Sequence, residues 1–120
     1  MLFVNTTNMI GEELLKNIKT ILGSAELVYS KGDFTSATIL YFKAVFTILD
    51  LILLRLEGKT PKDHTERFRM LQDKHPVLYE FLDKYFKIYR STYSISVDKE
   101  TCDKLRQNVK SIIKEYKIQV

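Results

Sequence analysis

The chain has few of the residues that interrupt helices. Its 120 residues include only four Gly and two Pro. So few turn-forming residues disfavour a turn-rich all-β sandwich, and 45% apolar with 28% charged residues excludes a disordered or collagen-like polymer. The length suits one core and is too short for a two-domain enzyme. We therefore expect an all-α protein with a single domain spanning residues 1–120.

Cysteine and histidine are too scarce for a disulfide or a recognisable metal site. A lone Cys102 cannot form an internal disulfide, and with two histidines it cannot assemble a zinc site by spacing. We expect neither a metal nor a cofactor. Residues 1–10 carry no cationic stretch before an apolar core, so they do not resemble a secretory signal. These features predict a reduced, cytoplasmic compartment.

Long hydrophobic runs and strong charge of one sign are also missing. The longest apolar stretch, residues 39–54, is interrupted by Lys43 and Asp50 and is shorter than the ~20 residues of a membrane-spanning helix. Nineteen Lys and Arg against fifteen Asp and Glu leave a net charge of +4. This charge permits an anionic partner without the density typical of nucleic-acid binders. We expect no membrane association.

Apolar residues recur at helical spacing along most of the chain. The first such segment begins behind Asn8, a suitable N-cap, and ends near residues 31–32. Asp33 can cap a second helix that ends at Gly58, where a C-terminal glycine is expected. Because the turn between these helices is short, they should run antiparallel.

Three shorter helices are predicted after Gly58. Asp63 and Glu66 have the spacing of a capping box that opens a helix through residue 71. Pro76 suits the first turn of a fourth helix, which runs to Tyr93. A fifth helix is expected after residues 95–97, with one apolar face that runs from Cys102 to Tyr116. Together the five segments predict an up-and-down helical bundle.

The second helix is apolar on nearly all sides between residues 44 and 54. Such a helix should be central and covered by neighbours in most directions. A bundle of this size can require a second copy of the chain to complete that burial. We therefore predict a homodimer, to which the second and fourth helices contribute.

Polar residues within this apolar helix form a stripe. Lys43, Thr47 and Asp50 are four and three residues apart, so they lie on one side. A buried carboxylate is unfavourable without a cationic or donor partner, and Arg90 is the best candidate for Asp50. Two interpretations stay open: an Asp50–Arg90 pair that only fixes helix packing, or a functional groove.

Candidate binding residues cluster around Arg90. Tyr93 and Ser94 follow it by three and four residues, so in a continuous helix the guanidinium, phenol and hydroxyl share a face that could hold a phosphate. His64 begins the third helix close to Lys62, where it could meet an anion or simply be a surface residue of the first turn. No histidine has a Ser or Cys partner at the spacing of a catalytic triad.

One segment of the chain comprises GDF at residues 32–34, Ala37, YFKAVF at residues 41–46, Asp50 and Leu51. It resembles the second helix of HEPN domains, the "higher eukaryotes and prokaryotes nucleotide-binding" group. EGKTPKDH at residues 57–64 resembles the loop that leads into its third helix. RSTYS at residues 90–94 falls where its functional arginine segment is expected. The resemblance spans residues 10–116.

The resemblance implies an up-and-down bundle, commonly dimeric and often the partner of a minimal nucleotidyltransferase in a toxin–antitoxin pair. Many family members are metal-independent ribonucleases with an Arg followed, after four to six residues, by a His. After Arg90 those positions hold Ile95, Ser96 and Val97, so the acid or base of that reaction is missing. We therefore assign no catalytic residue.

Three hypotheses follow from the sequence. The leading one is a HEPN-like protein that binds a nucleotide, an RNA phosphate or a nucleotidyltransferase, with its candidate residues being Lys43, Asp50, His64, Arg90, Tyr93 and Ser94. The second is a metal-independent ribonuclease that uses Arg90 with Tyr93, or Arg69 with His75. The third is a dimeric interaction module whose polar stripe only fixes packing.

Overall fold

Helices make up most of the chain in the computed structural model, which describes residues 2–120 and their side chains from residue 9 onward. The five helices are α1 (Leu2–Ser30), α2 (Phe34–Glu57), α3 (His64–Lys74), α4 (Pro76–Ser91) and α5 (Lys99–Glu115). No strand occurs within residues 2–120. The predicted all-α bundle of five helices is confirmed.

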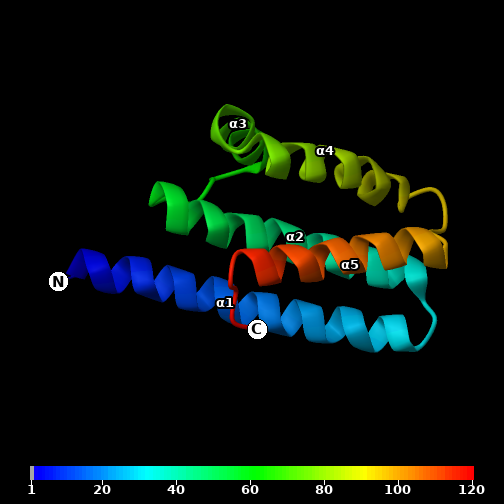
Figure 1. Ribbon diagram of the computed structural model, residues 1–120. Helices are drawn as coiled ribbons and strands as arrows, with labels where there is room; N and C mark the ends of the chain where they lie inside the picture. The colour runs from blue at the N-terminus through cyan, green and yellow to red at the C-terminus, as the bar shows by residue number, and fades with distance from the viewer. Residues whose placement is uncertain (1) are drawn as a thin grey trace.

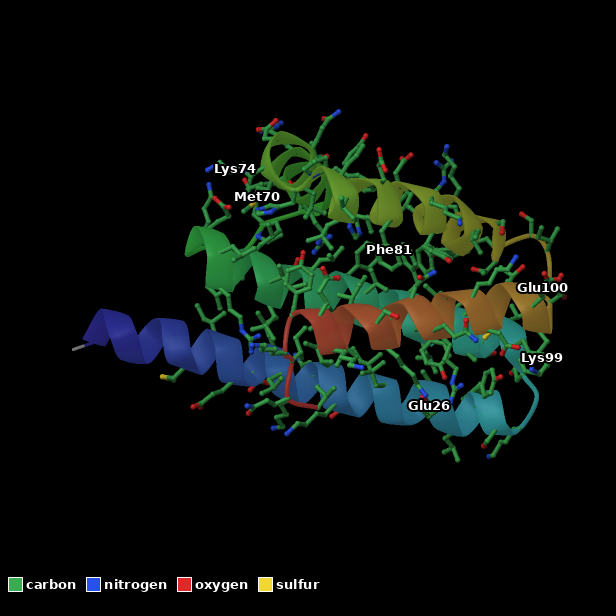
Figure 2. The ribbon with its side chains drawn as sticks, in the orientation of Figure 1. Glu26, Met70, Lys74, Phe81, Lys99 and Glu100 are labelled. Atoms are coloured by element: carbon green, nitrogen blue, oxygen red, sulfur yellow. The ribbon has the colours of Figure 1, made fainter. Side chains whose placement is uncertain are left out.

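The bundle is arranged around α2. Helices α1 and α2 are antiparallel and make the most extensive contact between any two helices (Figure 1). Helix α5 packs against α2, and so does α4. Helix α3 contacts α4 and is seen nearly end-on where α4 runs across the view (Figure 1). Figure 2 shows Phe81 on the side of α4 that faces α2 and α5. This arrangement leaves α2 in the middle, as its sequence predicts.

Polar caps and a glycine set the ends of the central helices where the sequence places them. The Asp33 carboxylate accepts a hydrogen bond from the Ser36 amide at 3.0 Å, and Gly58 ends α2 with a φ of 79°. That left-handed conformation suits glycine, which has no Cβ to clash. Asp63 caps α3 by accepting from the Glu66 amide at 2.8 Å. The predicted limits of α2 and the start of α3 are therefore confirmed.

Two predicted helix ends are wrong. Helix α1 begins at Leu2, so Asn8 lies inside it and is not its N-cap. Helix α4 ends at Ser91, before Tyr93. The hydroxyl of Thr92 donates to the Tyr89 carbonyl at 2.6 Å, and its amide donates to the same oxygen at 3.1 Å. Such local hydrogen bonds by Ser and Thr compete with helix continuation.

One chain buries half of the residues of α2. Its buried residues lie on all sides of the helix: Ala37, Thr38, Tyr41, Phe42, Ala44, Val45, Ile48, Leu49, Leu51, Ile52, Leu53 and Leu54. Of its large apolar side chains, Leu56 is the one that is strongly exposed, at 54%. The central position of α2 is confirmed, but its burial does not require a second copy of the chain, contrary to the argument from sequence.

By length and composition, α2 could cross a membrane. The helix is 24 residues long and is the one such helix among the described residues. The helix is longer than the apolar stretch of residues 39–54 on which the sequence-based expectation rested. However, 67% of its most apolar window is buried inside the bundle. A buried core helix meets the same criteria, so the observation is weak evidence for a membrane span.

Candidate functional site

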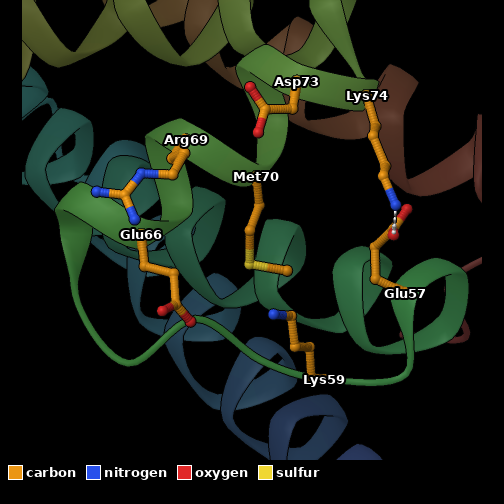
Figure 3. Close-up of a pocket in the computed structure, with 7 residues that line it drawn as sticks. All are labelled: Glu57, Lys59, Glu66, Arg69, Met70, Asp73 and Lys74. Atoms are coloured by element: carbon orange, nitrogen blue, oxygen red, sulfur yellow. Dashed lines mark hydrogen bonds and ion pairs between the residues drawn. The ribbon is translucent and has the colours of Figure 1, made fainter.

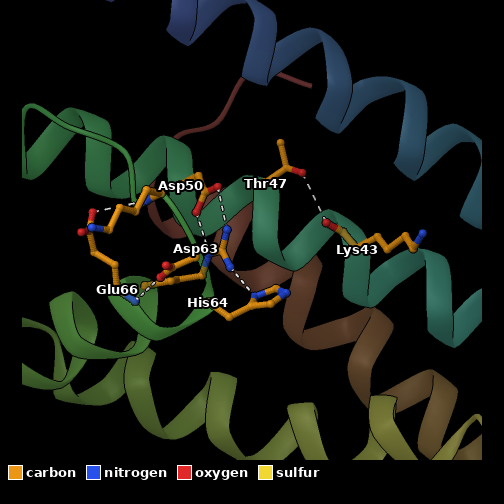
Figure 4. Close-up of polar contacts among 8 residues, drawn as sticks. Lys43, Thr47, Asp50, Asp63, His64 and Glu66 are labelled. Carbon is orange, nitrogen blue, oxygen red and sulfur yellow. Dashed lines mark hydrogen bonds and ion pairs between the residues drawn. The ribbon is translucent and has the colours of Figure 1, made fainter.

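The partner of Asp50 is Arg67, not Arg90. Arg67 Nε lies 2.7 Å from Asp50 Oδ1, and Arg67 Nη2 lies 3.0 Å from Asp50 Oδ2, so both carboxylate oxygens are bound. Arg67 is buried, with 8% of its surface exposed, and the Asp50 side chain is 17% exposed. The predicted Asp50–Arg90 pair is wrong because α3, not the end of α4, places a guanidinium against this part of α2. Figure 4 shows Asp50 with these contacts.

The sequence carried a signal for Arg67 that we did not use. Arg67 lies four residues before Leu71 and three after His64, so all three lie on the same side of α3. Leu71 is fully buried, which places this side against the core. A cation on the apolar side of a helix needs a carboxylate nearby. Asp50 is the one carboxylate in the apolar part of α2. The sequence therefore offers Arg67 and Asp50 as a possible ion pair.

His64 is held by the same ion pair. Arg67 Nη1 lies 2.6 Å from His64 Nδ1 (Figure 4). An arginine only donates hydrogen bonds, so Nδ1 must accept, and the ring hydrogen of a neutral imidazole is then on Nε2. The ring also packs against Phe46, with 4.6 Å between centroids. His64 is thus an exposed residue of the first turn, as one interpretation predicted, but its ring is fixed in place.

The structure does not bring Arg90, Tyr93 and Ser94 onto one helical face. Because α4 ends at Ser91, Tyr93 and Ser94 lie in the turn that follows, and both are exposed. Arg90 is exposed too, with its guanidinium carbon 6.0 Å from the centre of the Phe86 ring. Asp50 does not orient Arg90. The predicted groove of Asp50, Arg90, Tyr93 and Ser94 is therefore wrong in its geometry.

A different hollow joins two of the predicted residues. Lys43 and Tyr93 line a space of about 160 Å³ together with Ile39, Tyr89 and Thr92. The rings of Tyr89 and Tyr93 are 6.1 Å apart, edge to face. A hydrogen bond with the Tyr93 side chain and partial burial raise the pKa of Tyr89. The lysine of α2 thus lies beside two phenols at the end of α4.

Aromatic rings connect this hollow to His64. We call Phe46, His64, Phe86, Tyr89 and Tyr93 the aromatic face. Ring centroids are 6.1 Å apart for Phe46 and Tyr89, and 6.1 Å apart for His64 and Phe86. All five are at least partly exposed. The rings of Phe46, Phe86 and Tyr89 lie 6.1–6.3 Å from one another. They form a compact cluster between His64 and Tyr93.

Two cations flank the aromatic face without carboxylate partners. Within residues 9–120, neither Lys43 nor Arg90 forms an ion pair. Both side chains are exposed. An exposed cation that no carboxylate neutralises can attract an anion. Rings flanked by such cations can stack a base while the cations hold phosphate.

A second hollow has balanced charge. It has a volume of about 220 Å³ and is shown in Figure 3; its lining residues are Glu57, Lys59, Glu66, Arg69, Met70, Asp73 and Lys74. Lys74 Nζ lies 3.0 Å from Glu57 Oε1. Three carboxylates offset the three cations, so this hollow does not favour an anion over water.

Of the Arg69–His75 pair in the ribonuclease hypothesis, only Arg69 lines this hollow. His75 Nε2 is 3.0 Å from Glu57 Oε2. Hydrogen bonds from Lys74 and His75 lower the pKa of the Glu57 carboxyl. His75 is half-buried and lies between α3 and α4. Its ring nitrogen already has a carboxylate partner that joins α2 to the α3–α4 junction.

No metal centre is present among the described side chains. No three His, Cys, Asp or Glu residues from residue 9 onward are grouped so that they could hold an ion. Cys102 is free and buried, and burial raises the pKa of its thiol. A buried thiol with a raised pKa is a small core residue and not a nucleophile.

Comparisons with known proteins give no relative. No family model matches the chain, and no curated protein or solved structure matches it either.

Proposed function

We propose that this protein is a HEPN-like module that binds single-stranded RNA or a nucleotide on its aromatic face. The observation that carries the proposal is the hollow beside Lys43, where a cation without a carboxylate partner adjoins the Tyr89 and Tyr93 rings. Arg90 adds a second such cation next to Phe86. Base stacking on rings with phosphate held by Lys and Arg is the usual chemistry of single-strand binding.

Removing Tyr93 is expected to weaken RNA binding strongly. The side chain is 79% exposed, so its loss leaves the fold intact while removing one stacking surface. Tyr93→Ala should lower the binding free energy by about 1–3 kcal/mol, the value of one base stacked on an aromatic ring. Fluorescence anisotropy with a short labelled single-stranded RNA at low salt measures the change.

The loss of either cation should change how strongly RNA affinity depends on salt. Arg90→Ala and Lys43→Ala should each lower the slope of log affinity against log salt by about 0.7, as expected for one lost phosphate contact on a single strand. Lys104→Ala is the matched control, because Lys104 is an exposed cation on α5 that pairs with Glu100 at 3.3 Å. If Lys104→Ala lowered this slope as much as Arg90→Ala and Lys43→Ala do, RNA binding at the aromatic face would be contradicted.

The partners expected from the sequence are also proposals. Since Leu56 is the one large apolar side chain of α2 that is strongly exposed, a homodimer is supported by the HEPN resemblance and not by an uncovered core. Sedimentation equilibrium should give twice the chain mass of 14.1 kDa. A mass of one chain at micromolar concentration would exclude the dimer. The same resemblance supports a nucleotidyltransferase partner and a toxin–antitoxin role.

The ribonuclease and the purely structural module have less support. No observation places an acid or base beside Arg90, and His75 is engaged with Glu57. The structural hypothesis assigned a packing role to a pair of Asp50 with Arg90, and the observed pair of Asp50 with Arg67 suits that role. This ion pair does not include Lys43, Arg90 or Tyr93. Binding of RNA through these three residues is compatible with a structural role for the pair.

A further inference from the structure

The ion pair of Asp50 and Arg67 has a third member with a free polar atom. Arg67 uses Nε and Nη2 on Asp50, and it uses Nη1 on His64 Nδ1 at 2.6 Å. This fixes the neutral imidazole as the tautomer with hydrogen on Nε2. Across the described side chains, Nε2 of His64 makes no hydrogen bond, and the residue is exposed. His64 therefore presents a single, oriented N–H group.

Carboxylates lie close to this group, whereas no carboxylate that the structure describes pairs with Lys43. Asp50 neutralises Arg67, and Asp63 accepts from the Glu66 amide at the start of α3. The Glu66 carboxylate in turn accepts from the Lys62 amide at 3.3 Å. The Asp63 carboxylate thus occupies one of the amide donors that a phosphate would otherwise use at this helix end. An uncharged hydrogen-bond acceptor suits the position better than an anion.

Two neighbouring aromatic rings pack against the His64 ring. Phe46 is 4.6 Å away and Phe86 is 6.1 Å away, between centroids. Phe46 lies in turn 6.1 Å from Tyr89, which lines the hollow with Lys43. A nucleotide strand with its phosphates near Lys43 and Arg90 could therefore extend along the rings and bring a base edge to His64.

We infer that His64 is a base-reading residue that donates Nε2–H to a carbonyl oxygen of an RNA base, and that Arg67 is its positioning residue. The inference rests on the proposed RNA-binding function and adds a specificity to it. At position 4 of the base, an N–H donor favours the keto oxygen of uracil over the exocyclic amino group of cytosine, because two donors would face each other in the second case.

The test compares short oligo(U) with oligo(C) on the parent and on two variants. The parent should bind oligo(U) about two- to tenfold more tightly, the ratio expected for one neutral hydrogen bond. His64→Phe keeps an aromatic ring against Phe46 without a donor, so it should bring the ratio to one. His64→Gln has a carbonyl to accept from Arg67 and an amide to donate outward, so it should keep the preference.

The outcomes separate this inference from the proposed function. If the parent binds neither oligomer, RNA binding on the aromatic face is refuted and base reading with it. If the parent binds both and the ratio is unchanged in His64→Phe, only the role of His64 is overturned. Lys104→Ala, the control on α5, should leave the ratio at the parental value.

A measurement on the protein without RNA tests the positioning by Arg67. Imidazole nitrogen NMR of the parent at neutral pH should show the hydrogen of His64 on Nε2 and none on Nδ1. Arg67→Lys, which cannot form the three contacts of the guanidinium, should give a mixture of both tautomers and a smaller preference for oligo(U). A parental His64 with its hydrogen on Nδ1 would overturn the inference whatever the variants do.

Discussion

Replacing Arg67 with alanine is expected to lower the free energy of unfolding by about 3 kcal/mol, at the lower end of the range for breaking a buried ion pair. The change removes the hydrogen bonds at 2.7 and 3.0 Å that satisfy both oxygens of Asp50. The carboxylate would then stay largely buried, because its side chain is only 17% exposed. Urea unfolding followed by circular dichroism measures the loss.

Two further variants make this result specific to the pair. Arg90→Ala should change stability by less than about 0.5 kcal/mol, as is usual for a surface residue. The double change Asp50→Leu with Arg67→Met should recover most of the stability, because apolar groups of similar volume often replace a buried ion pair without loss. An Arg90→Ala variant as unstable as Arg67→Ala would contradict the assignment of Arg67 as the partner.

The second large effect is expected at Phe42. This side chain is fully buried in α2 and stacks on Tyr89 of α4, with 4.9 Å between centroids and 14° between ring planes. Phe42→Ala should cost about 3–5 kcal/mol of unfolding free energy, since it removes a buried ring and leaves a cavity. Chemical denaturation at neutral pH provides the value.

Tyr93→Ala is the matched control for Phe42→Ala. It also removes an aromatic ring near Tyr89, but from a side chain that is 79% exposed. Its stability should stay close to that of the parent. A loss below about 1 kcal/mol for Phe42→Ala would contradict the packing of α4 on α2, because a full-sized cavity in a core is rarely so mild.

The helices could be predicted because local chemistry sets them. Asp33 and Gly58 mark the ends of α2 through a side-chain cap and a left-handed backbone, both of which depend only on nearby residues. The start of α4 follows equally from Pro76. The end of α4 was missed because Ser91 and Thr92 capture helix carbonyls with their hydroxyls, and helical periodicity does not register that competition.

The site was harder to predict because it depends on how helices meet. Lys43, His64, Arg90 and Tyr93 were identified from residue type and spacing along single helices. Which cation reaches Asp50 depends on how α3 lies on α2, and helical spacing does not contain that information. Arg67 was the missing residue, since its contact with Asp50 joins positions 17 apart in sequence.

The attachment of α3 to α2 has a consequence for local motion. Besides the buried Leu71, polar pairs hold α3 in place, at Asp50 with Arg67 and at Glu57 with Lys74 and His75. The α3–α4 hairpin should therefore open more often than α1 and α2, whose mutual contact is far more extensive. Because rings of both parts form the aromatic face, an occupying ligand would hold the hairpin shut and slow amide hydrogen exchange there first.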